Sequence, residues 1–126
     1  MNDDPHTILL RELHKSIQDQ ADYTLSLVGA QKAANLAYPP GVTLSPAEQT
    51  ALTSLRLSDE AQRALRKLLV DALSGPLFHM FSLMDTISEP EDMDDGEQWF
   101  GARFEPGVYE NGLMLHDELF ASYPLE

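Results

Sequence analysis

The chain contains no cysteine, few bases and no long apolar run. Without cysteine it cannot form a disulfide framework, a zinc–thiolate site or a thiol nucleophile, and a reducing compartment is the simpler expectation. No apolar stretch approaches the roughly 20 residues that span a bilayer, and the acidic start, residues 1–5, differs from a basic secretory signal. We therefore expect a cytoplasmic protein of bacterial type that makes no membrane contact.

Bases are outnumbered by acids, 8 to 21, which gives a net charge of −13. The excess lies at one end: Asp85–Glu126 holds twelve carboxylates and the single base Arg103, whereas Met1–Met84 holds nine carboxylates and seven bases. Such a field repels nucleic acid and attracts cationic proteins. The main basic cluster, at 63–67, is too small to offset it, so we expect a basic protein partner and no nucleic acid.

The length and apolar content favour one folded domain. With 126 residues, of which 43% are apolar, the chain can bury one core. Apolar residues recur every three or four positions over 5–28 and 61–73, which indicates helices with one apolar face. We expect a mainly α fold, a compact bundle of about four helices. Within this single domain, 1–88 forms the helical body, and 89–126 is an acidic loop plus an aromatic-rich segment that packs on it.

Proline, glycine and serine mark the expected helix ends. The first helix is predicted to run as one long, bent rod from Pro5 to about Tyr38, with a break near Gly29 as the alternative. Ser45-Pro46-Ala47-Glu48 has the pattern of a capping box and predicts a second helix start. Ser58-Asp59-Glu60 indicates a third.

Gly75-Pro76 predicts the end of that third helix and the start of another. Residues 77–87 are apolar on nearly every side, so they are expected to form the central core helix. The charged run Glu89–Glu97 predicts an exposed loop. Beyond it we expect a small irregular or β-hairpin segment. In it Trp99–Phe104 is interpreted as a short strand, Pro106-Gly107 as the turn behind it and Asn111-Gly112 as a second turn, followed by a helical segment over 115–123.

Clustered carboxylates raise the question of a metal site. If Gly96 takes the sixth position of a calcium loop, Met93 falls at the third position and Ala102 at the twelfth, where a glutamate belongs. His116-Asp117-Glu118 could serve a metal, but adjacent helical residues diverge by about 100°. We expect no metal and no cofactor, and we keep a metal-dependent enzyme using His116 and neighbouring carboxylates as an alternative.

Nucleophilic catalysis is not favoured either. His79, Ser82 and Asp85 follow one another at spacings of three, but the acid lies nearer to the serine than to the histidine, which is the wrong order for a relay. No G-x-S-x-G elbow accompanies them. We therefore expect no enzymatic activity.

Aromatic residues alternate with carboxylates in the acidic third, as in interface anchors with a charged rim. The predicted partner-binding residues are Glu91, Asp92, Asp94, Asp95, Glu97, Trp99 and Phe100. The leading hypothesis is a non-catalytic acidic module that masks a basic partner, such as a bacterial immunity protein or antitoxin bound to a toxin or nuclease. The other alternative is a structural or oligomeric helical protein whose first helix pairs with that of a second copy, as a homodimer.

Overall fold

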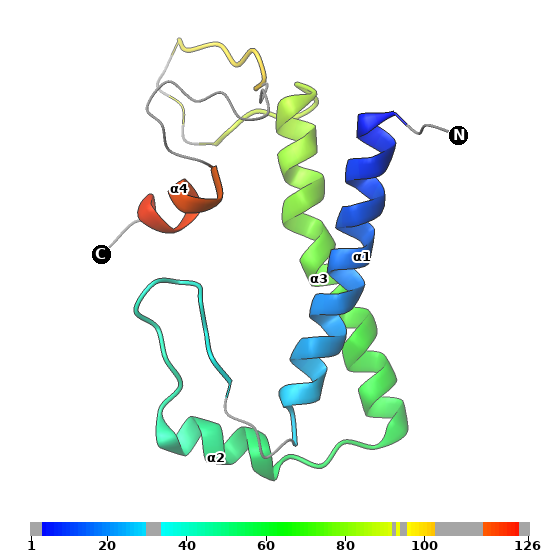
Figure 1. Ribbon diagram of the computed structural model, residues 1–126. Helices are drawn as coiled ribbons and strands as arrows, with labels where there is room; N and C mark the ends of the chain where they lie inside the picture. Colours follow the sequence, from blue (N-terminus) through cyan, green and yellow to red (C-terminus); the bar gives the residue numbers. More distant parts are fainter. Residues whose placement is uncertain (1–3, 30–33, 92, 94–95, 103–114, 124–126) are drawn as a thin grey trace.

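A computed structural model describes residues 4–29, 34–91, 93, 96–102 and 115–123. Within these residues lie four helices: α1 (Pro5–Leu27), α2 (Pro46–Ser54), α3 (Asp59–Met84) and α4 (Leu115–Ala121), arranged as in Figure 1. Of the described residues 64% are helical and none is in a strand. The expected mainly α class with about four helices is confirmed.

Helix α1 begins where the local sequence favours a start but ends earlier than we expected. Asp4 caps it by accepting hydrogen bonds from the backbone N–H groups of His6 and Thr7, and Pro5 occupies the first turn. The prediction of one long helix to Tyr38 is wrong, since α1 ends at Leu27. The reason is tertiary: Gly29 has a φ of 77°, in the left-handed region, and its N–H donates to a carbonyl of α2.

The helix starts at α2 and α3 confirm the predictions from capping patterns. The Ser45 hydroxyl accepts from the Glu48 N–H at 3.1 Å, and the Glu48 carboxylate accepts from the Ser45 N–H at 2.8 Å, which completes the capping box. These hydrogen bonds, with the backbone one first, lower the pKa of Glu48 below its ordinary value of 4.5. At α3, Ser58 accepts from the Ala61 N–H.

Helix α3 passes through Gly75 and Pro76, so the predicted break there is wrong. A proline inside a helix removes one hydrogen bond and costs about 3 kcal/mol. The helix nevertheless continues, and Leu77 and Phe81 beyond the proline face α1 across an open cavity. The predicted central core helix over 77–87 is also wrong: Phe78 in α3 is 75% exposed, and Ile87, which follows α3, is 80% exposed.

Helices α1 and α3 form an antiparallel pair (Figure 1). Among described helices, no other pair has comparable contact. The Arg66 guanidinium of α3 joins the pair: its Nε donates to Asp22 at 2.7 Å and its Nη2 donates to the Gln18 side chain at 2.6 Å, both on α1. Hydrogen bonding to Arg66, followed by its charge, lowers the pKa of Asp22 below 3.8. Four helices with this pairing agree with a helical bundle, and of the described residues Ala21 and Ser82 alone are buried.

The C-terminal segment contacts the helical body through aromatic rings. The Tyr38 ring lies 6.1 Å from that of Phe120 and 5.4 Å from that of Tyr123, measured between ring centroids. Helix α4 agrees with the helix predicted over 115–123. The described part of the predicted strand, residues 99–102, is not in a sheet, and the predicted turns at 106–107 and 111–112 lie outside the described residues. The two-part division of the domain stays a prediction.

Candidate functional site

The acidic segment, Glu89–Glu97, follows the end of α3. Its described carboxylates, those of Glu89, Glu91 and Glu97, belong to exposed residues. None of the three forms an ion pair with another described residue. The predicted partner-binding residues Asp92, Asp94 and Asp95 lie outside the described residues. The described members therefore display negative charge that the rest of the described chain does not neutralise.

Trp99 fixes the chain that follows the acidic segment. Its indole N–H donates to the backbone carbonyl of Leu83 at 2.8 Å, in a half-buried position at the end of α3. Two residues later, Gly101 has a φ of 83°, and a Cβ atom there would lie 2.7 Å from the Met84 carbonyl oxygen. Residues 99–101, which we call the tryptophan clamp, thus lie directly against the last turn of α3.

Phe100 lies within the tryptophan clamp but points outward. Its side chain is 79% exposed, and it lies between Trp99, which donates a hydrogen bond to α3, and Gly101, whose backbone lies close to the Met84 carbonyl oxygen. The structure thus distinguishes the two predicted aromatic anchors. Trp99 makes an intramolecular hydrogen bond that holds the segment in place, whereas Phe100 is available for an intermolecular contact.

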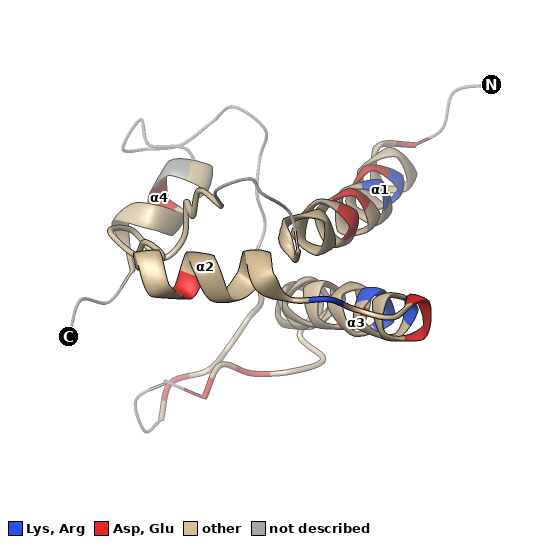
Figure 2. Ribbon diagram, turned by 90° about the horizontal axis from the view of Figure 1, so that it is seen from below, with Lys and Arg blue, Asp and Glu red and all other residues tan. Residues whose placement is uncertain are grey.

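Bases gather on α1 and α3, away from the acidic segment (Figure 2). Several of them are paired: Lys15 with Asp19 at 2.7 Å, Arg63 with Glu60 at 3.2 Å, and Arg66 with Asp22. Hydrogen bonding and charge at Asp19 raise the pKa of Lys15. Two of the three bases of the 63–67 cluster therefore interact with neighbouring carboxylates.

His79, Ser82 and Asp85 are not joined as a reactive group. At the end of α3, Ser82 is buried while His79 and the C-cap residue Asp85 are exposed, and no side-chain hydrogen bond joins them within the described chain. In α4, His116 is exposed, and the Asp117 side chain lies outside what the structure describes. The described residues hold no group of three or more histidines and carboxylates that could ligate a metal. In the same part of the chain, no helix is both long and apolar enough to cross a bilayer.

Comparison of the chain with protein-family models, with curated proteins and with solved structures found no match. The geometry of the surface itself therefore carries the functional inference.

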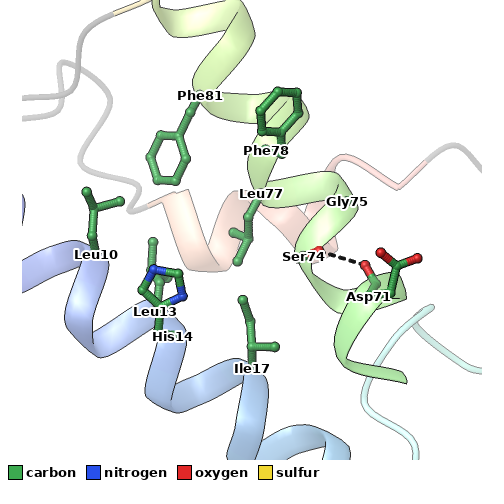
Figure 3. Close-up of a pocket in the computed structure, with 10 residues that line it drawn as sticks. All are labelled: Leu10, Leu13, His14, Ile17, Asp71, Ser74, Gly75, Leu77, Phe78 and Phe81. Atoms are coloured by element: carbon green, nitrogen blue, oxygen red, sulfur yellow. Dashed lines mark hydrogen bonds between the residues drawn. The ribbon is translucent and has the colours of Figure 1, made fainter. Parts of the chain in front are cut away.

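A second surface feature, the α1–α3 groove, was not predicted from the sequence. It is an open cavity of about 460 Å³ between the first half of α1 and the second half of α3 (Figure 3). It is lined by Leu10, Leu13, His14, Ile17, Asp71, Ser74, Gly75, Leu77, Phe78 and Phe81. The volume would suit a small ligand, but the polar lining is sparse, and the Ser74 hydroxyl already donates to the Asp71 carbonyl oxygen.

The signal for this groove was present in the apolar spacing. Leu10, Leu13 and Ile17 recur at intervals of three and four, and Leu77 and Phe81 continue the apolar pattern of α3. With a helix break at Gly75-Pro76, that apolar pattern would belong to two separate helices. Because α3 instead continues through Pro76, its residues on both sides of the proline line one groove.

Proposed function

We propose that this chain is a non-catalytic, acidic protein-binding module that masks a basic partner, as a bacterial immunity protein or antitoxin masks a cationic toxin or nuclease. The main support is the outward Phe100, held by the tryptophan clamp, beside exposed carboxylates that form no ion pair with another described residue. The absence of cysteine favours a reducing setting, such as the bacterial cytoplasm.

The arrangement suits capture of a basic surface. Clustered carboxylates steer a cationic partner during encounter and also repel its nucleic-acid substrate. An exposed aromatic side chain can then enter an apolar pocket of the partner, which is the usual role of an interface anchor. Because Trp99 and Gly101 already fix the neighbouring backbone, little ordering of this short segment is required on binding.

The test begins with capture of a partner from native cells by the tagged full-length chain. Affinity of the purified pair is then measured by calorimetry for the chain and for Glu91→Gln/Glu97→Gln. Exposed charges contribute about 0.2–1 kcal/mol each, so the double variant should bind about 2- to 30-fold more weakly. The loss should shrink at high salt, since the Debye length falls below about 10 Å above 0.1 M.

Glu12→Gln/Glu60→Gln is the matched control, because it removes the same two charges from exposed positions on α1 and α3. It should change the affinity much less than the test variant. A partner without a basic surface, or equal losses in both double variants, would contradict the proposal. Phe100→Ala should weaken binding at least about tenfold if Phe100 is an anchor.

A further inference from the structure

Two helices alone do not enclose a core, and this pair leaves much apolar surface in contact with solvent. In α1 and α3, Ala21 and Ser82 are the buried residues, while Phe78 is 75% exposed and Leu10 is 44% exposed. Both exposed side chains line the α1–α3 groove.

The groove and a projecting side chain lie on the same surface. Leu13, Ile17 and Leu77 are half-buried parts of the lining, whereas Phe78 is its most exposed large apolar side chain (Figure 3). A two-fold symmetric interface requires one patch that is complementary to itself. A cavity adjoining a projecting phenyl ring meets this requirement, because each copy offers both the ring and the space that receives it.

The low net charge of the α1–α3 pair favours a second copy of the chain over a basic partner at this surface. Helix α1 carries two bases and three acids, and α3 carries three of each, so the pair has a net charge of −1 out of −13. The remainder, −12, belongs to the rest of the chain. Another copy can therefore approach by the α1–α3 face with little repulsion, whereas a basic partner is attracted elsewhere.

The available area is on the scale that a stable dimer needs. Helix α1 has 23 residues and is about 35 Å long at ~1.5 Å per residue. Two adjacent helices of about 10 Å diameter give a face of roughly 700 Å², close to the ~800 Å² per partner of a standard interface. Packing one pair against another also yields a four-helix bundle, the common way in which such pairs bury their apolar faces.

We propose that the α1–α3 groove is a self-association site: a second copy of this chain packs its own α1–α3 face there, and Phe78 of each copy enters the groove of the other. This inference does not depend on the proposed function, since no described residue of the acidic segment lines the groove. A dimer would display two acidic segments, one from each copy.

Sedimentation equilibrium of the full chain, from about 1 to about 100 µM, tests the proposal. The expected mass rises to about 28 kDa, twice the 14.0 kDa of one chain. Phe78→Glu should abolish the dimer in this range, and Phe78→Ala should raise the dimer dissociation constant at least about tenfold. Phe78 is largely exposed in the single chain, so helical circular dichroism should be unchanged in both variants at concentrations where the wild type is monomeric.

Ile87→Glu is the matched control, because it introduces the same charge at an 80% exposed apolar position outside the groove. It should leave the dissociation constant within about twofold. A monomer at every concentration would overturn the proposal, even if a helix of another protein were found in the groove. A dimer that Phe78→Glu leaves intact, or that Ile87→Glu weakens equally, would overturn it as well.

Discussion

Replacing Gly101 with alanine should release the tryptophan clamp from α3. The added Cβ atom would lie 2.7 Å from the Met84 carbonyl oxygen and 2.9 Å from the Thr86 side chain. At a φ of 83°, a left-handed conformation costs an L-residue about 1–2 kcal/mol. Overpacking against backbone costs about 1–3 kcal/mol more, so Gly101→Ala raises the energy of the attached state by roughly 2–5 kcal/mol.

The attachment is weaker than this cost. The hydrogen bond from Trp99 to Leu83 contributes about 0.5–1.5 kcal/mol. Its loss does not leave the Leu83 carbonyl without a donor, because the Thr86 N–H also donates to it at 3.2 Å. We therefore expect the variant to detach residues 99–101 rather than to tolerate the strain.

Trp99 is the only tryptophan of the chain, so its fluorescence reports this detachment directly. Gly101→Ala should shift the emission to the red while the helical circular dichroism stays unchanged. Gly96→Ala is the control: Gly96 has a φ of 89°, but a Cβ atom there meets nothing within 4 Å. That variant should keep the wild-type emission. Wild-type emission in Gly101→Ala would show that the added methyl group does not detach Trp99 from α3.

Gly29 and Gly41, both between α1 and α2, allow a similar comparison. A Cβ atom at Gly29 would lie 2.9 Å from the Leu55 carbonyl oxygen, whereas one at Gly41, which has nearly the same φ, would meet open space. Thermal unfolding should therefore show Gly29→Ala to be less stable than Gly41→Ala by about 1–3 kcal/mol, and equal stabilities would contradict a role for the close approach of Gly29 to Leu55. Acid should also weaken the fold. Arg66 lowers the pKa of Asp22 in the folded chain, so the stabilising contribution of the Asp22 carboxylate is complete above pH 3.8 and is lost as the pH falls through its folded-state pKa. Asp22→Asn should therefore lower the melting temperature at pH 7 and make it less sensitive to pH below 4 than the wild type; an unchanged pH profile would contradict this.

The helix starts were predictable because they depend on local chemistry. Pro5, Ser45 and Ser58 satisfy or replace the first N–H groups of their own helices within three residues. The helix ends were not predictable, because they depend on residues that are distant in the sequence. At Gly29 the chain turns where a carbonyl of α2 accepts the Gly29 N–H, and α3 continues through Pro76 to residues that face α1 across the groove.

The candidate site, too, was predictable only in part from the sequence. Charge patterning alone indicated an exposed segment at Glu89–Glu97, and its described carboxylates are exposed. The different roles of Trp99 and Phe100 could not be read from the chain, because the hydrogen bond to Leu83 spans 16 residues. The groove required knowing that α3 continues through Pro76.

Hydrogen exchange on the purified complex maps the partner's contact on the chain itself. Binding of the basic partner at residues 89–102 predicts slower exchange there, with the first half of α1 unchanged between the free and bound chain at equal dimer content. Slower exchange confined to α1, with residues 89–102 unaffected, would exclude binding through the acidic segment.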